Sequence, residues 1–489
     1  MIDQAAQLIA EQMKLDGGLV WIIAIVLRIA LVAAAFLPAI SLIAMFSIWW
    51  ERKVAGHIQS RLGPMHVGGW HGWAQSLADG IKLILKEDLM PSGADGFLFR
   101  LAPYLAFAPV FAAFLALPFG PQFVFENGLN IGVLYLLAVL SVEVMGTILA
   151  GWGSNSKWAI YGAMREACQM VSYEIPLGLA IICGVLVAGT LNLIELSYLQ
   201  GGGIHTWFVF HNPFIFAAFG LYFIASLASN KRAPFDLPES ESELVAGFHT
   251  EYSGMRFAFF FFAEYAGMFV VGAIQTALFL GGWNSPLGGY DPVYAVLGYD
   301  PVATGQAFFT GSISAAQGAQ ATAGAMGLTV GGMLALNLYC TLIFVVKVFT
   351  LIFVQIWLRW TLPRIRIDQV LYTCVKVLLP ASLIVLAGVA VWVLMEEHLR
   401  GPVAGDTARH ALYLMRDTTP MLTVVTQIVL TIAGLAFVGS FVGVVLWAFV
   451  TRDRQTRKTF FPDIMPVGNE ISFTPGKIKA AATEPEPAA

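Results

Sequence analysis

Nine long apolar runs dominate this chain and limit what it can fold into. A helix needs roughly 20 apolar residues to cross the hydrocarbon core of a bilayer. The runs therefore predict an all-α, polytopic integral membrane protein with about nine transmembrane helices. They lie at about 18–50, 98–118, 131–151, 170–190, 206–228, 255–281, 327–357, 371–395 and 421–451.

The composition supports the same class of protein. Of the 489 residues, 58% are hydrophobic and 12% are charged, whereas a soluble domain carries roughly 25% charged residues. The net charge of -4 argues against a nucleic-acid partner. The cysteines lie too far apart to form metal-ligand pairs, and no nucleotide-binding glycine motif follows a plausible strand. We therefore expect the chain to hold no metal and no redox cofactor of its own. The cysteines are Cys168, Cys183, Cys340 and Cys374.

Lys and Arg gather in alternate loops, which predicts how the helices are oriented. Most of these residues lie in or beside four loops, or in the tail after residue 451. The pattern predicts an N-terminus outside the cell and a cytoplasmic C-terminus. Segment 397–420 departs from the pattern, because it places three arginines outside. The four cytoplasmic loops are 51–97, 152–169, 229–254 and 358–370.

The rest of the chain adds no second folded domain. Residues 1–455 are predicted to form a single helical membrane domain. The N-terminus is not a cleavable signal, because acidic residues precede an apolar run that is too long. Residues 282–326 lack Lys and Arg and predict an insertion on the outer face. The tail 456–489 is predicted to be a disordered cytoplasmic segment.

The first cytoplasmic loop predicts an amphipathic helix on the membrane surface. Its polar stripe contains Asp79, Lys82 and Lys86. Such a helix either anchors the chain or forms the rim of an opening for a lipid-soluble substrate, and the physics alone favours an anchor. The apolar stripe, with three- and four-residue steps, comprises Trp70, Trp73, Leu77, Ile81 and Ile84.

The third cytoplasmic loop is the most acidic. Asp236 fits the N-cap of a helix that has Pro238 near its start, and Glu239 would complete a capping box. Capping does not explain the remaining acids, which form either a coupled acidic cluster or a solvated face. These remaining acids are Glu241, Glu243 and Glu251.

The second and fourth loops place further charges where helices meet the cytoplasm. In the fourth, plain positive-inside anchoring is the simplest explanation. The charged residues at or near the membrane surface are Lys157, Arg165, Glu166 and Glu174 in the second loop, and Arg364, Arg366 and Asp368 in the fourth.

Seven stretches of these loops are long enough to compare with known families. They are Glu51-Arg52-Lys53, Gln59 to Pro64, Ala78 to Leu83, Gly151 to Lys157, Ser172-Tyr173-Glu174, Arg232 to Glu239 and Pro363 to Asp368. In this order they resemble the signature loops of the H subunit of proton-pumping NADH:quinone oxidoreductase, respiratory complex I, called subunit 1 in mitochondria. The resemblance covers about 18–395 and implies eight family helices, to which 421–451 adds a C-terminal one. Ser229 stands where the family usually has an acid, which leaves the completeness of the usual proton path open.

The resemblance implies a membrane subunit that catalyses no reaction alone. It would form a quinone-binding channel with the hydrophilic arm and couple quinone reduction to proton translocation, in a bacterial inner membrane. FMN and iron–sulfur clusters would belong to partner subunits, and quinone would be the substrate. The implied channel residues are Arg52, Gln59, Arg61, Asp79, Lys82, Arg232, Phe235 and Asp236. The implied coupling residues are Glu143, Glu174, Glu239, Glu241, Glu243, Glu251 and Glu264. Docking of the other subunits would involve Lys157, Arg165, Arg364, Arg366 and Asp368.

Acidic residues inside the apolar runs support the coupling role. Glu143 lies deep in the third run and Glu264 in the sixth, while Glu174 sits near the start of the fourth. A charge at the centre of a membrane helix costs about 3 kcal/mol. Pairing with Arg28 or Lys347 would offset that cost, but three acids outnumber two bases. At least one carboxylate is therefore expected to bind and release protons.

Three other functions remain open from the sequence. A homologous subunit of a membrane-bound hydrogenase, or of a complex that uses ferredoxin or F420, would share several motifs. A stand-alone secondary transporter is disfavoured, because the chain shows no inverted repeat. A purely structural anchor is disfavoured by the charged residues inside the apolar runs.

Overall fold

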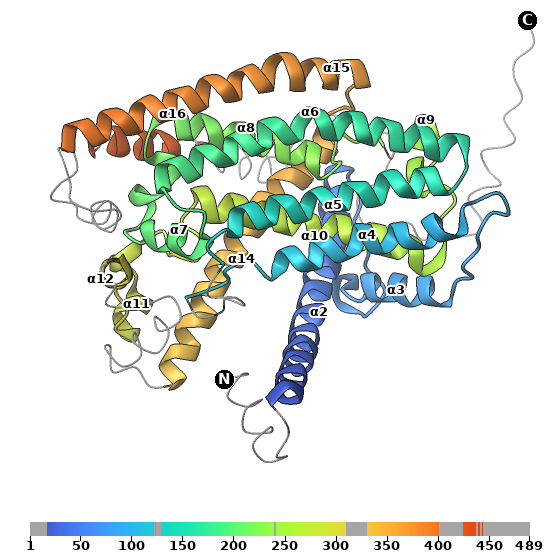
Figure 1. Ribbon diagram of the computed structural model, residues 1–489, viewed down its shortest axis with the longest axis horizontal. Coiled ribbons are helices and arrows are strands. Elements are labelled where there is room, and N and C mark those ends of the chain that lie inside the picture. Colours follow the sequence, from blue (N-terminus) through green and yellow to red (C-terminus); the bar gives the residue numbers. More distant parts are fainter. Residues whose placement is uncertain are drawn as a thin grey trace, which may run out of the picture. The chain divides into compact units, whose positions relative to one another are not determined.

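The helices of the computed structural model follow the apolar runs of the sequence (Figure 1). The structure describes residues 17–121, 123, 129–238, 241–309, 330–400, 424–436, 439–440 and 443, and every regular element among them is helical. Contacts divide the chain into Met1–Leu430 and Thr431–Ala489, and the second unit is helical over its described residues. The predicted tail 456–489 and residues 310–326 of the insertion lie outside the described residues.

One helix occupies each of the first eight predicted runs, so an all-α polytopic membrane fold is confirmed. The ninth run contains a helix at Val424–Ala436, but most of its remainder lies outside the described residues, and the count of nine stays a prediction. By length and composition, six described helices are suited to crossing a membrane: α4, α5, α6, α10, α14 and the helix that ends in α16. The helices in the first eight predicted runs are α2 (Gly17–Ile58), α4 (Gly96–Phe114), α5 (Gly132–Gly153), α6 (Lys157–Ala188), α8 (Pro213–Ser229), α10 (Gly254–Phe279), α14 (Val330–Thr361), and a continuous helix made of α15 (Ile367–Tyr372), a π-helical turn (Thr373–Leu378) and α16 (Leu379–Arg400).

Short elements gather at the two ends of the bundle. In Figure 1, α7, α11 and α12 lie at one end, and α3 and α9 lie at the other, beside the motif loops. The described part of the insertion is therefore at the end opposite the motif loops. The short elements are α3 (Gln75–Leu85), α7 (Leu193–Leu199), α9 (Glu241–Leu244), α11 (Pro292–Leu297) and α12 (Pro301–Phe309), with 3-10 turns at Trp70–Gly72, Ile204–Thr206, Phe208–Phe210, Gly247–His249 and Gly288–Tyr290.

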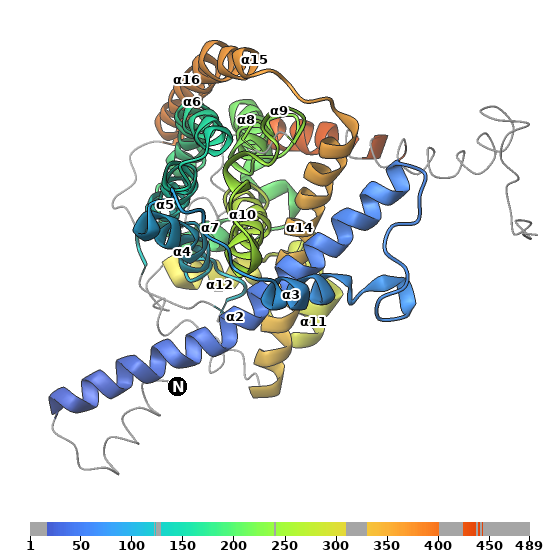
Figure 2. The same cartoon turned by 90° about the vertical axis from the view of Figure 1, so that its right-hand side faces the viewer.

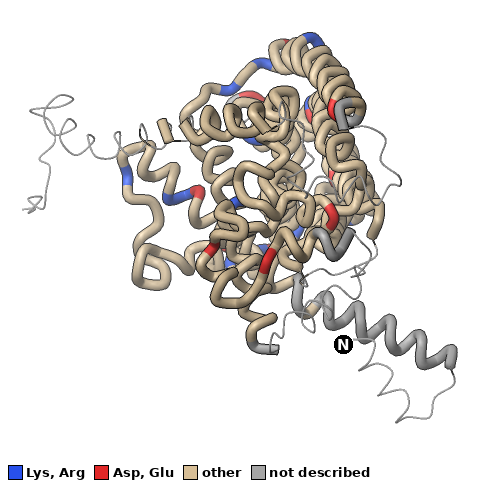
Figure 3. Tube along the Cα trace, turned by 90° about the vertical axis from the view of Figure 1, so that its left-hand side faces the viewer, with Lys and Arg blue, Asp and Glu red and all other residues tan. Residues whose placement is uncertain are grey.

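The long helices pack side by side and carry few charges. Helix α16 lies beside α6 in both Figure 1 and Figure 2, and the two are in contact. Most of the trace in Figure 3 is tan, with short blue and red segments where charged residues interrupt it. Charged residues inside this bundle therefore need specific partners.

Helix α6 corrects the prediction for the second cytoplasmic loop. The apolar run predicted a helix from residue 170, but α6 begins at Lys157, so Glu174 lies in mid-helix and not near the start of the helix. Small residues allow this polar end to pack closely. A Cβ at Gly162 would approach the backbone nitrogen of Phe248 to 2.7 Å. Contacts with a distant loop thus extend the helix beyond its apolar part.

The predicted helix of the third loop is also corrected. Helix α9 starts at Glu241 and lasts one turn, so Asp236 is not its N-cap. The Asp236 carboxylate instead accepts a hydrogen bond from Nη2 of Arg364 at 3.1 Å. Glu239 lies outside the described residues, and the side chain of Glu241 is likewise not described. The ion pair to the fourth loop replaces the local capping interaction.

The amphipathic helix of the first loop is confirmed as α3 for Leu77, Ile81 and Ile84, but its predicted start is wrong. Helix α3 begins at Gln75, and Trp70 and Trp73 precede it, Trp70 in a 3-10 turn. Ser76 is buried on its inner side, where the hydroxyl donates to the Met45 carbonyl at 2.9 Å. The predicted apolar stripe is exposed, as expected for a helix whose outer side faces lipid. The exposed fractions are 80% for Trp70, 62% for Trp73, 49% for Leu77, 51% for Ile81 and 63% for Ile84.

Helices α4 and α5 pack closely at Gly146, which gives a stability prediction. A Cβ at Gly146 would lie 2.5 Å from the backbone nitrogen of Ala106, whereas a Cβ at Gly220 would meet nothing within 4 Å. Overpacking of this kind costs about 1–3 kcal/mol. We expect Gly146→Ala to lower the thermal unfolding midpoint in detergent. Gly220→Ala should leave it unchanged or raise it, because Ala favours helix. Equal midpoints in the two variants would contradict the close helix contact.

Candidate functional site

A chain of buried charges crosses the interior between the first and third loops. The Arg232 guanidinium donates from Nη1 to Oε2 of Glu51 at 3.1 Å, and its Nη2 lies 3.0 Å from Oε1 of Glu264. Arg359 donates to the other oxygen of Glu51 at 2.7 Å. Arg232 is 1% exposed and stacks over the Tyr265 ring at 4.4 Å. We call Arg359, Glu51, Arg232 and Glu264 the ion chain.

The helical geometry of α2 explains how adjacent residues of the first motif contact two different parts of the protein. Successive residues of a helix point about 100° apart, so Glu51 faces inward to Arg232 while Arg52 faces α3. Arg52 forms an ion pair with Asp79 of α3. Asp79 also accepts from Nε2 of Gln75 at 3.0 Å. One adjacent acid–base pair in the sequence therefore joins two different clusters.

Interactions with α6 and the fourth loop hold the segment after α8 in place. Nε2 of Gln169 donates to the carbonyl oxygens of Ala228 and Phe235 at 2.9 and 2.8 Å. The backbone N–H of Ile365 donates to the Pro234 carbonyl at 3.1 Å. These bonds satisfy a buried loop backbone, which would otherwise be costly. They fix Arg232 between the helices that carry its acidic partners.

A cavity of about 210 Å³ begins where the ion chain ends. Glu264 lines it together with Glu143 and Glu174, the two other acids predicted inside the apolar runs. Lys231 also lines the cavity, and its Nζ lies 3.4 Å from Oε1 of the fully buried Glu166. Three acids from α5, α6 and α10 and one base from the third loop thus surround one space.

His249 lies beside this cluster in a 3-10 turn outside the spanning helices. Its ring packs against Phe248, with 3.8 Å between centroids, and against Phe260 at 5.5 Å. Burial lowers the pKa of His249 to about 3, so the ring is neutral at physiological pH. A neutral histidine here leaves the positive charges to Lys231 and Arg232.

The predicted site residues fall into two groups. Arg232 and the carboxylates of Glu143, Glu174 and Glu264 come together, and Phe235 and Asp236 are buried in the same loop. Arg165 forms an ion pair with Glu243, with 2.5 Å between Nη1 and Oε2, and neither residue lines the cavity. Glu251 is half-buried and does not line the cavity. The exposed residues that the structure does not bring to the ion chain are Gln59, Arg61, Lys82, Lys157, Arg366 and Asp368.

Reasoning from the sequence assigned no site role to several members of the cluster. Glu51 belongs to a motif stretch and Glu166 to the charges expected near the membrane surface, whereas Lys231 and Arg359 were not singled out. The signal for Glu51 was present, since a helix that puts Arg52 on one face turns Glu51 toward another. Lys347, predicted as a partner for the acids, instead donates to backbone carbonyls. The side chain of Arg28, the other predicted partner, is not described.

Within the described residues no group of three His, Cys, Asp or Glu side chains could hold a metal ion. The four cysteines are unpaired, and only Cys168 is exposed. Ion pairs and carboxylates make up the described site. The prediction that this chain carries no metal stays a prediction.

Comparisons with known proteins place the chain in a family. Residues 30–390 match the NADH dehydrogenase family. The H subunit of the NADH-quinone oxidoreductase of Chlorobium luteolum is 45% identical over 371 residues, which is 75% of this chain and 90% of that protein. The same-named subunit of Anaeromyxobacter dehalogenans is 41% identical over 387 residues, 79% of this chain and 86% of that protein. The chain belongs to the NADH dehydrogenase family, together with the H subunits of NADH-quinone oxidoreductases.

Proposed function

We propose that the chain forms the quinone-binding channel with the hydrophilic arm of an NADH:quinone oxidoreductase and couples quinone reduction to proton translocation. The observation that carries the proposal is the position of Arg232. This one buried guanidinium contacts Glu51 next to the first motif loop and Glu264 at the carboxylate cavity. A change of charge near the first loop is thereby transmitted to protonatable groups inside the membrane.

The quinone would enter beside α3. The exposed apolar stripe of α3 suits a membrane surface, and the Arg52–Asp79 pair lies on the inner side of this helix. Quinone takes up two electrons and two protons on reduction to quinol. The electrons come from NADH through FMN and iron–sulfur clusters of partner subunits. This chain contributes charged and hydrogen-bonding groups that bind the headgroup and respond to its change of charge.

The cytoplasmic ends of the helices would dock the partner subunits. Lys157, Arg366 and Asp368 are exposed near the ends of α6 and α15. Exposed charges with no ion pair among the residues that the structure describes suit contacts across a subunit interface. The neighbouring membrane subunits would cover the lipid-facing helices. A hydrogenase-type complex and a stand-alone transporter gain no support from the relatives, which are named as quinone oxidoreductase subunits.

The proposed orientation puts the motif loops in the cytoplasm of a bacterial cell, with the N-terminus outside. The Lys and Arg distribution supports it. A reporter fused after residue 460 should then be active in the cytoplasm. Activity of that fusion only outside the cell would remove the ninth span and reverse the assignment of the C-terminus.

Asp79→Asn tests the proposed quinone site. The Arg52–Asp79 pair is partly exposed, so its loss should barely change stability. We expect quinone reduction by NADH to fall on the order of tenfold or more, because a group that aligns the substrate is lost. Reduction of a soluble artificial acceptor by the same complex should be unchanged.

A matched control lies close by in the sequence. Asp88 and Arg256 form an ion pair of 3.0 Å with similar exposure. Asp88→Asn removes the same charge and should leave both activities intact. If the two variants behaved alike, the Arg52–Asp79 pair would have no role in quinone binding.

A further inference from the structure

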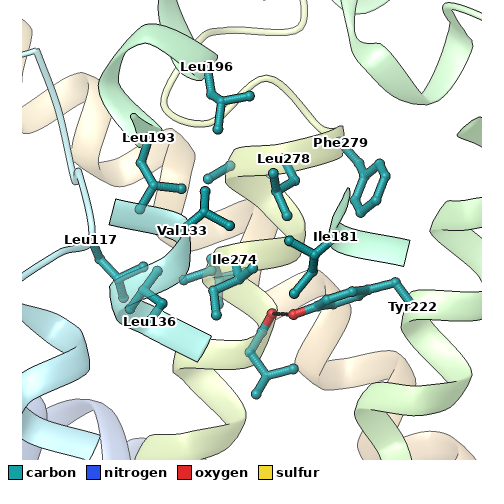
Figure 4. Close-up of a cluster of buried hydrophobic side chains, with 14 of the residues drawn as sticks. Leu117, Val133, Leu136, Ile181, Leu193, Leu196, Tyr222, Ile274, Leu278 and Phe279 are labelled. Atoms are coloured by element: carbon teal, nitrogen blue, oxygen red, sulfur yellow. Dashed lines mark hydrogen bonds between the residues drawn. The ribbon is translucent and has the colours of Figure 1, made fainter. Parts of the chain in front are cut away.

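An apolar layer, whose side chains are shown in Figure 4, adjoins the cavity. Ile274 and Tyr222 border both the cavity and this layer. Side chains from five helices and the segment that follows α4 fill it, and each is at most 3% exposed. A packed apolar layer of this kind does not hold water, because a buried water molecule needs two to four polar partners. The layer comprises Leu117, Val133, Leu136, Ile181, Leu193, Leu196, Tyr222, Ile274, Leu278 and Phe279.

Hydroxyl groups at this level are engaged by backbone carbonyls. Tyr222 donates to the Val271 carbonyl at 3.0 Å, drawn as a dashed line in Figure 4. Thr276 donates to the Gly272 carbonyl at 2.9 Å. Neither hydroxyl is directed at a second hydroxyl that would continue a proton path. The layer therefore separates the carboxylates from the end of the bundle that carries α7 and α11.

A half-buried lysine lies beyond the layer. Nζ of Lys347 donates to the carbonyl oxygens of Leu280, Gly282 and Asn284 at 2.6, 3.0 and 2.7 Å. It also lies 4.2 Å from the centre of the Trp207 ring, whose face attracts a cation. An ammonium group has three N–H donors, so all three are used. A neutral amine would turn its lone pair toward one of these oxygens, and the arrangement fits the charged form.

The loop that presents these carbonyls is built for close packing. Gly281 and Gly282 both have positive φ, at 77° and 53°. A Cβ at Gly281 would lie 2.4 Å from Nε1 of Trp207, and one at Gly282 would lie 2.3 Å from Oγ of Ser197. Only glycine at both positions lets the carbonyls converge on the ammonium. The hydrogen-bond partners of the ammonium group are thus backbone carbonyls, which hold it in place more rigidly than flexible side chains would.

The position of the charge relative to the cavity suggests its role. Ile274 is the last residue of α10 that lines the cavity, and Leu280 follows six residues later. At 1.5 Å per residue this separation is about 9 Å along the helix. The carbonyls at the end of α10 stabilise a positive charge there, as expected for a helix C-terminus. The charge stands between the carboxylates and the far end of the bundle.

We propose that Lys347 is a fixed positive charge that, with the apolar layer, prevents protons from leaking between the carboxylate cavity and the far end of the bundle. A proton that approached from that end would meet an apolar barrier and a like charge. Fixed cations exclude protons from other membrane pores in the same way. The inference rests on the proposed role of the cavity in proton transfer, but its test does not require turnover.

The test measures passive proton flow through the complete complex in lipid vesicles without NADH. A potassium diffusion potential drives protons, and a dye trapped inside the vesicles reports pH. We expect Lys347→Met to raise the protein-dependent proton flow on the order of tenfold. This factor follows from the repulsion between the lysine charge and a proton about 10 Å away at an effective dielectric constant of about 20. Lys347→Arg should stay as tight as the parent protein. Lys376→Met is the matched control, since Lys376 is exposed and contacts the Tyr372 ring at 5.1 Å.

Lys347→Gln covers the case in which the methionine variant fails to assemble, because its amide still donates two hydrogen bonds to the carbonyls. Raised proton flow in either assembled uncharged variant, with none in the control, supports the proposal. Flow equal to that of the parent protein in every assembled uncharged variant overturns it. That result would leave the function proposed for the cavity untouched, because quinone reduction and pumping are measured separately.

Discussion

Replacement of Arg232 by Met should nearly abolish quinone reduction while leaving reduction of soluble acceptors intact. The change removes the guanidinium that joins Glu51 to Glu264. Glu51 keeps Arg359 as a partner at 2.7 Å, but Glu264 loses an ion pair inside a buried cluster. Loss of one electrostatic partner at a reacting centre lowers rates on the order of a hundredfold. We expect a loss of that size in quinone reduction.

The same variant will also lose stability, and the two effects need to be separated. Removing one partner of a buried ion pair costs about 3–5 kcal/mol, because it leaves the other charge unpaired. Arg232→Met combined with Glu264→Gln removes that unpaired charge and should restore much of the stability. Quinone reduction should stay low in the double variant. Recovery of activity together with stability would mean that Arg232 has only a structural role.

Arg256→Met is the matched control for this experiment. Arg256 also pairs with a carboxylate, but at the surface, and it stacks on the Phe99 ring at 5.5 Å. The control should keep full activity with a small loss of stability. Equal loss of both electron-transfer activities in the assembled Arg232→Met complex would place the defect in the hydrophilic arm and contradict the proposed channel.

The sequence predicted which segments are helical because membrane helices must be long and apolar. That rule depends only on local composition, and it located each of the first eight helices. It failed at the polar start of α6, where Gly162 packs on Phe248 and Arg165 pairs with Glu243. Those partners lie some 80 residues further along the chain, and composition alone holds no information on such contacts.

The acidic residues of the candidate site were predicted from the sequence, but their basic partners were not. Intramembrane position singled out Glu143, Glu174 and Glu264, and all three line one cavity. The bases near them were misassigned. Lys347 was expected to pair with the acids, yet Lys231 and Arg232 from a loop occupy that position. A loop that folds back between helices puts charges at a depth that a hydropathy profile assigns to apolar residues.

Asp236 shows the same limit at the level of a single side chain. Its spacing to Glu239 matched a capping box, which is a local pattern. The structure uses its carboxylate for Arg364 instead, 128 residues away. An ion pair between loops replaces a local hydrogen bond to the backbone, and a single sequence offers no means of choosing between them.

Neutralising the carboxylates of the cavity should separate electron transfer from proton pumping. Glu143, Glu174 and Glu264 come from three different helices, so no local structural element needs all of them. An unpaired charge at the centre of a membrane helix costs about 3 kcal/mol. We expect Glu→Gln at one or more of these positions to stop pumping or coupled quinone reduction in an assembled complex.

The three variants should differ according to their surroundings. Glu264 contacts Arg232, so Glu264→Gln should slow quinone reduction as well as pumping. Glu143 faces α10, where a Cβ at Gly267 would lie 3.7 Å from its Oε2, and its loss should act on proton transfer alone. Glu174 is exposed at the rim of the cavity and should have the smallest effect. The measurement is proton uptake by vesicles per quinone reduced, with Asp88→Asn as a surface control. Unchanged pumping and turnover in all three assembled variants would show that the cavity carries no protons, and would leave its acids with a structural role.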